Sequence, residues 1–178
     1  MKSTLLYLLL TGSFTVTFGQ RNFVVDSARI AFTIENAGLQ VDGGLEGFEA
    51  SIDFDPKCLD ASIIKASVNI NTINTGIPIR DKHLKRSDYF DAVNYGRITM
   101  TSNRFKKEKS DGYLGYFALT IKQITREIPI HFTCIQNSKQ LTFSATFSIK
   151  RSDFQLGDSS IILSDIVNIT VVVIGAVD

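Results

Sequence analysis

Residues 140–150 read Gln-Leu-Thr-Phe-Ser-Ala-Thr-Phe-Ser-Ile-Lys, and apolar side chains occupy every second position from Leu141 to Ile149. Polar side chains fill most of the positions between them. A period of two is the pattern of a β-strand with one face in a core and the other in water. This stretch therefore predicts a half-buried strand of an antiparallel sheet.

The same alternation recurs along the chain and predicts about eight strands. The other apolar faces are Ile30, Phe32 and Ile34; Phe48, Ala50, Ile52 and Phe54; Ala66, Val68 and Ile70; Ile98 and Met100; Phe117, Leu119 and Ile121; Ile128, Ile130 and Phe132; and Val167, Ile169, Val171 and Val173. Gly, Asp, Asn, Pro and Ser cluster at 42–44, 55–56, 110–112, 136–138 and 157–160, which indicates turns. Strands joined in this way favour an all-β antiparallel barrel or a sandwich.

Residues 75–96 interrupt the strand pattern with a polar, helix-prone segment. We expect one short helical crossover here that covers an end of the barrel, with Phe90 facing inward. A segment of this kind often carries function. Arg80, Asp81 and His83 would then lie at the mouth, where the cationic groups could meet a phosphate or another polar head group. Alternatively, these side chains hold the crossover together and bind nothing.

Residues 1–19 predict a secretory signal peptide, because Lys2 precedes an apolar run over 5–18. That run is shorter than the roughly 20 apolar residues of a membrane span. Residues 20–178 suit a single domain without a transmembrane segment. Without Lys2 the chain has 18 basic and 18 acidic groups, a balance that does not favour nucleic acid as partner. We expect an exported protein, periplasmic or secreted.

Cys58 and Cys134 are the only cysteines. Export would permit a disulfide between them, whereas Cys134 continues an apolar strand face on which a free thiol packs as a small hydrophobe. The sequence leaves both alternatives open. With two histidines and no CxxC, it predicts neither a metal site nor a cofactor. GxSxG, HExxH and phosphate-binding glycine loops do not occur in it, so we expect a protein that is not an enzyme.

A series of motifs follows in order along nearly the whole mature chain. They are Asp26-Ser27 with Ile30-x-Phe32, Val41-x-Gly43, Ile52-Asp53-Phe54-Asp55-Pro56, Thr75-Gly76 with Arg80-Asp81-x-His83-Leu84, Asp88-Tyr89-Phe90-Asp91, Leu119-Thr120-Ile121-Lys122, Phe147-x-Ile149-x-Arg151-x-Asp153-Phe154, and Asp165-x-Val167. In these residues the chain resembles the YceI-like family of exported polyisoprenoid-binding proteins. The resemblance implies an eight-stranded lipocalin-like barrel with an apolar tunnel, and an isoprenoid or similar long-chain lipid as ligand.

A barrel of eight strands is just wide enough either to be filled by side chains or to hold one small ligand. Two functions are therefore open: an exported carrier or store of a polyisoprenoid, and a structural or stress-related interaction module whose barrel is filled. For the first, the candidate lumen residues are Phe32, Phe48, Phe54, Ala66, Val68, Phe90, Met100, Phe117, Leu119, Phe132, Phe143 and Phe147. An exposed sheet edge would also permit a homodimer.

Overall fold

The computed structural model describes residues 23–177, so the predicted signal peptide at 1–19 lies outside the described residues. The strands are β1 (Phe23–Asn36), β2 (Leu39–Leu45), β3 (Glu49–Asp53), β4 (Ile63–Asn69), β5 (Arg97–Lys107), β6 (Gly112–Ile121), β7 (Ile124–Asn137), β8 (Gln140–Lys150) and β9 (Leu163–Val177). The helical segments are η1 (Leu59–Ala61), η2 (Ile70–Thr72), α1 (Pro78–Leu84) and η3 (Arg151–Phe154).

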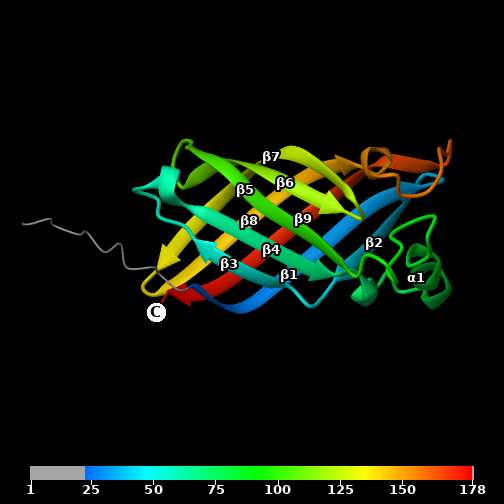
Figure 1. Ribbon diagram of the computed structural model, residues 1–178, viewed down its shortest axis with the longest axis horizontal. Helices are drawn as coiled ribbons and strands as arrows, with labels where there is room; N and C mark the ends of the chain where they lie inside the picture. The colour runs from blue at the N-terminus through cyan, green and yellow to red at the C-terminus, as the bar shows by residue number, and fades with distance from the viewer. Residues whose placement is uncertain (1–22, 178) are drawn as a thin grey trace, which may run out of the picture.

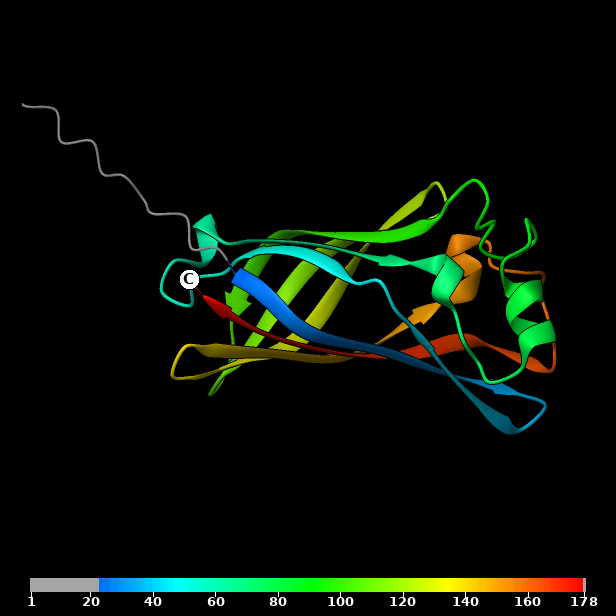
Figure 2. The same cartoon turned by 90° about the horizontal axis from the view of Figure 1, so that it is seen from below.

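All nine strands form one antiparallel sheet in the order β2-β1-β9-β8-β7-β6-β5-β4-β3. The sheet curls around a long axis into an incompletely closed barrel, as Figures 1 and 2 show. α1 and η3 lie at one end, and β1 begins at the other end, where Phe23 pairs with Val177. The all-β antiparallel barrel with one short α-helical crossover is confirmed, but it has nine strands and not the eight expected. Within residues 23–177 its edges β2 and β3 do not pair with each other.

The strand that the sequence analysis missed is β2, and the turn predicted at 42–44 is wrong. The chain reverses instead at Ala37 and Gly38, both of which have positive φ angles of 52° and 77°. Gly43 lies within β2, directly opposite Phe32 of β1. A Cβ atom on Gly43 would sit 2.3 Å from the Phe32 ring. The glycine therefore makes room for an aromatic side chain and does not form a turn.

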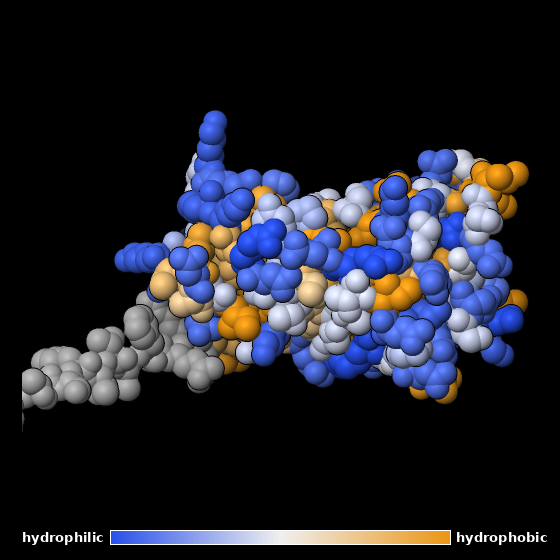
Figure 3. Space-filling view, turned by 45° about the horizontal axis from the view of Figure 1, so that its top comes forward, coloured by the Kyte–Doolittle hydropathy of each residue, from blue (hydrophilic) through white to orange (hydrophobic). Residues whose placement is uncertain are grey.

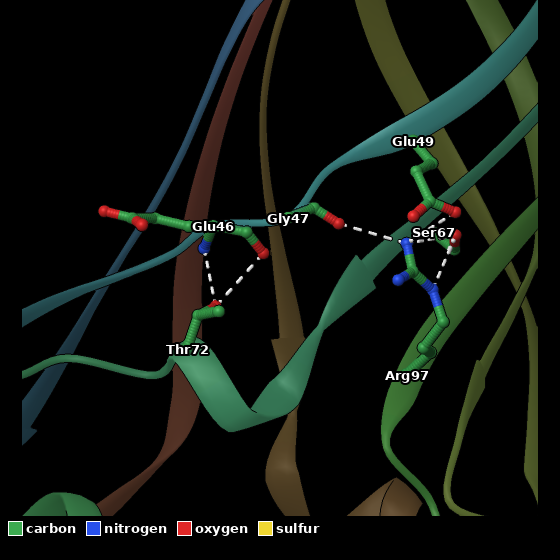
Figure 4. Close-up of polar contacts among 6 residues, drawn as sticks. All are labelled: Glu46, Gly47, Glu49, Ser67, Thr72 and Arg97. Atoms are coloured by element: carbon green, nitrogen blue, oxygen red, sulfur yellow. Dashed lines mark hydrogen bonds and ion pairs between the residues drawn. The ribbon is translucent and has the colours of Figure 1, made fainter.

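Side-chain contacts hold the connection between the two edge strands (Figure 4). Thr72 of η2 donates its hydroxyl to the Glu46 carbonyl at 3.0 Å and accepts from the Glu46 N–H at 2.7 Å. Arg97 of β5 donates through Nη2 to the Gly47 carbonyl at 3.0 Å and lies 3.1 Å from Glu49 Oε2. These contacts tie the β2–β3 connection to the rest of the barrel in place of a direct ladder between the edges.

Aromatic side chains fill the half of the barrel farther from α1. The Phe54 ring meets those of Phe105, Tyr113, Phe132 and Phe143 edge-on, with centroids 5.0–5.7 Å apart. This distance and orientation are favourable for aromatic pairs. All five rings are buried, so this half of the lumen is solid.

Both cysteines are free thiols in the structure, which favours the packed-thiol alternative over the disulfide. Cys58 is exposed before η1, whereas Cys134 is buried in the same core as the aromatic rings. Burial raises the pKa of the Cys134 thiol to about 11, because the thiolate loses its hydration there.

Replacement of Phe54 by alanine should lower the free energy of unfolding by about 3–5 kcal/mol, because it leaves a cavity among rings that cannot collapse. Urea denaturation followed by circular dichroism measures this change. Leu39→Ala, at an exposed site, serves as control and should shift the free energy by less than about 0.5 kcal/mol. A Phe54→Ala loss no larger than the control would show that the rings do not close the barrel.

The two thiols should differ in reactivity toward iodoacetamide at pH 8, since the thiolate is the reactive form. We expect Cys58 to be modified in the folded protein and Cys134 only after denaturant is added. Mass spectrometry of the Cys58→Ser variant isolates the second thiol. Rapid modification of that variant without denaturant would contradict the burial of Cys134.

Candidate functional site

The half of the barrel next to α1 encloses a cavity of about 650 Å³. Its walls come from β1, β2, β4, β5, β6, β8 and β9. The crossover (75–96) and the β8–β9 loop (155–162) border its outer end. The volume lies within the roughly 300–1,000 Å³ of small-molecule sites. The barrel is therefore filled with aromatic rings in one half and hollow in the other.

Along β6 and β9, short apolar side chains stand in place of rings and leave this half open. In β6 and β9 the inward positions beside the cavity carry Leu119, Ile121, Val167 and Ile169. Leucine and β-branched side chains reach less far toward the barrel axis than the phenylalanine and tyrosine rings of the other half. The result is a cavity with an apolar wall and polar groups mainly at its outer end.

The candidate lumen residues fall into two groups. Those that line the cavity are Phe32, Phe48, Ala66, Val68, Phe90, Met100, Leu119 and Phe147. Those that pack in the solid half instead are Phe54, Phe117, Phe132 and Phe143. Alternation indicates which side chains of a strand face the interior, but it carries no information on their level along the barrel axis. Phe90 lies outside the strands, in the crossover. Contact of the first group with a ligand stays a prediction.

The predicted mouth residues also divide. Arg80 and His83 border the cavity, whereas Asp81 does not. The Asp81 carboxylate accepts hydrogen bonds from Thr75 N at 2.9 Å and from the Thr75 hydroxyl at 2.5 Å. Arg80 donates through Nε and Nη2 to the hydroxyl and carbonyl oxygens of Thr75, each at 2.8 Å. Asp81 thus holds the crossover together, and Arg80 does so while facing the cavity.

Arg151, at the start of η3, is a buried cation beside the cavity. Its side chain donates to the carbonyl oxygens of Ser164 at 3.1 Å, Leu156 at 2.9 Å and Asp158 at 2.7 Å. Among residues 23–177 no carboxylate lies within 4.0 Å of it. In the sequence, Arg151 stands only within one of the motifs of the YceI-like resemblance. Its position directly after an apolar strand was the signal that could have singled it out as a site residue.

Hydrogen bonds fix the two segments that border the mouth. Asp165 accepts from the Ser152 hydroxyl at 2.7 Å and from its N–H at 2.9 Å, and the hydroxyl bond holds the pKa of Asp165 below its usual range. The Gly157 N–H donates to the Asp88 carbonyl at 2.8 Å, which joins the β8–β9 loop to the crossover. The mouth is therefore built from segments that support each other.

Residues 23–177 contain neither a metal-binding cluster nor a membrane-spanning helix. No cluster of three or more His, Cys, Asp or Glu side chains in this range could hold a metal ion. None of the helices in this range has the length and apolar character needed to cross a membrane.

The curled antiparallel sheet and its internal cavity define a β-barrel protein with an apolar pocket. The chain belongs to the YceI-like family, because the model of the YceI-like domain matches residues 22–174. Protein YceI of Escherichia coli O17:K52:H18 (strain UMN026 / ExPEC) is 26% identical over 136 residues, which cover 72% of this chain and 71% of that protein.

Solved structures agree with this assignment at the level of the fold. BcnA of Burkholderia cenocepacia has a TM-score of 0.81 at 23% identity and covers 85% of this chain and 99% of its own. A polyisoprenoid binding domain from Saccharophagus degradans, implicated in plant cell wall breakdown, has a TM-score of 0.70 at 12% identity. That match covers 89% of this chain and 99% of the domain.

Removal of the Asp81 carboxylate should loosen the crossover, because two hydrogen bonds to Thr75 are lost. In Asp81→Ala we expect about tenfold or faster amide hydrogen exchange over residues 75–91, which corresponds to the loss of about 1.5–3 kcal/mol for a hydrogen bond to a charged group. Asp60→Ala, in η1 outside the crossover, is the control. Unchanged exchange in Asp81→Ala would mean that other contacts hold the mouth.

Proposed function

We propose that this protein binds a polyisoprenoid or a similar long-chain lipid in the cavity and carries or sequesters it after export. The observation that carries the proposal is the apolar cavity of about 650 Å³, whose polar lining groups lie mainly at the α1 end. The polyisoprenoid binding described for the Saccharophagus degradans domain, which shares the fold, supports the choice of ligand. Export rests on the signal peptide predicted at 1–19.

The energetics favour a chain of several isoprene units. Burial of one five-carbon unit contributes about 3–4 kcal/mol at roughly 0.8 kcal/mol per carbon. Association costs about 4–15 kcal/mol in lost translational and rotational freedom. One unit would therefore bind weakly, whereas two units exceed the lower end of this cost and four units reach its upper end. Such a chain needs an apolar wall along its whole length, as this cavity provides.

The closed aromatic half determines how such a ligand would lie. The chain would point toward Phe54 and its neighbouring rings, which fill the far end of the lumen. Its polar end would remain at the mouth beside Arg80, His83 and Arg151, the cationic or hydrogen-bonding groups that border the cavity. A phosphate or hydroxyl head group could accept hydrogen bonds from these side chains. No step of bond making is required, so the role is binding and not catalysis.

The alternative function, an interaction module with a filled barrel, is supported by the solid half alone. The cavity in the other half is what distinguishes the two functions. Native mass spectrometry of the protein purified from its own host, followed by organic extraction, tests them directly. A stoichiometric long-chain lipid is the expected result. An empty protein that also fails to take up geranylgeraniol would overturn the binding proposal.

A bulky side chain in the cavity wall should block uptake while the barrel stays folded. Ala66 of β4 lines the cavity, and tryptophan there would occupy the space of the ligand chain. We expect Ala66→Trp to lower the affinity for geranylgeraniol by about tenfold or more, equivalent to about 1.4 kcal/mol. Lys65→Trp, at the exposed neighbouring position of the same strand, is the matched control.

Circular dichroism must show that both tryptophan variants are folded before their affinities are compared. Equal affinities for the Ala66→Trp and Lys65→Trp variants would place the ligand outside the cavity.

A further inference from the structure

The α1 end of the barrel carries the most exposed large apolar side chains of residues 23–177. We call them the apolar rim: Leu39, Ile79, Val93, Ile161 and Ile162. Their side chains are between 61% and 104% exposed, whereas every other large apolar side chain in this range is at most 49% exposed. Single exposed apolar residues are common on protein surfaces, whereas all five of these lie in segments at one end of the barrel.

The rim is assembled by the tertiary structure from three separate segments. Leu39 opens β2 directly after the β1–β2 turn, Ile79 and Val93 lie in the crossover, and Ile161 and Ile162 end the β8–β9 loop. The Ala37 N–H donates to the Ile162 carbonyl at 2.7 Å, which joins the turn to the loop. Figures 1 and 2 show all three segments at the α1 end, and Figure 3 shows apolar surface there beside polar surface.

Unpaired cations accompany the apolar rim. Within residues 23–177, Lys82 and Lys85 of the crossover have no carboxylate within 4.0 Å. The nearby Asp88 is engaged by Arg86 at 3.4 Å and by His83 at 3.5 Å. Exposed isoleucines beside free lysines fit the boundary between the acyl chains and the anionic head groups of a lipid bilayer.

We propose that the apolar rim docks the open end of the barrel onto an anionic membrane surface, so that a lipid passes between bilayer and cavity without crossing water. The occupant is a membrane and not a second protein, because the rim lies at the same end of the barrel as the apolar cavity, and Ile162 belongs both to the rim and to the cavity wall. This inference rests on the proposed lipid-binding function and adds the surface from which the ligand is taken or to which it is delivered.

Vesicle flotation of the mature protein tests the docking. The probes are vesicles of equal parts phosphatidylethanolamine and phosphatidylglycerol. The Ile79→Asp/Ile161→Asp double variant should lower the partition coefficient by about tenfold or more, because charged side chains oppose insertion. The matched control is Val24→Asp/Ile135→Asp, which adds the same charge at exposed apolar sites of β1 and β7 outside the rim. The control should repel the anionic surface less, since its new charges lie away from the docking face.

Equal losses in the rim and control variants, or no flotation of the unmodified protein, would overturn the docking proposal. Concentration-dependent dimers that only the rim variant abolishes, without vesicle binding, would assign the rim to a second copy of the chain and also overturn it.

A second readout separates docking from lipid binding itself. Geranylgeraniol is supplied either from cyclodextrin in solution or from the same vesicles, and uptake is measured for each variant. The rim variant should take it up normally from cyclodextrin but about tenfold more slowly from vesicles. Slow uptake from both sources would overturn a role restricted to docking. If the unmodified protein takes up none from cyclodextrin, the proposed lipid-binding function fails, whatever the flotation result.

Discussion

The contact of the Phe54 ring with four other aromatic rings is the interaction on which the rest of this barrel depends. It closes one half of the lumen with buried, edge-on packed side chains. Because that half is solid, the cavity is confined to the half next to α1, where polar side chains of the crossover and of the β8–β9 loop border it. A barrel hollow along its whole length would have no preferred end.

The unpaired edges β2 and β3 are the second constraint. Exposed edges can pair with other chains, so proteins shorten or cover them. Here both edge strands are short, and Arg97 and Thr72 tie the connection between them to β5 and η2. The same region forms part of the cavity wall through Phe48. An incompletely paired barrel can thus hold its cavity shape without a continuous ladder.

Much of the architecture was predictable, because alternation of apolar and polar residues depends only on local backbone geometry. It predicted the strands, the inward side chains and the interruption that contains α1. It failed at β2, because Gly43 was interpreted as a turn residue when its role is to make room for Phe32 across the pair. Arg151 was not singled out, since its acceptors at Leu156, Asp158 and Ser164 meet only after β8, η3 and β9 pack together.

The sequence by itself determined the all-β class, the inward face of each strand it identified and the position of the crossover. It also carried the motifs of the YceI-like family. Only the tertiary structure decided which inward residues meet as a solid core and which surround a cavity, because the level of a side chain along the barrel axis depends on the register between strands. The apolar rim at the α1 end was likewise not predictable from the sequence, since it brings together residues as far apart in the chain as Leu39 and Ile161.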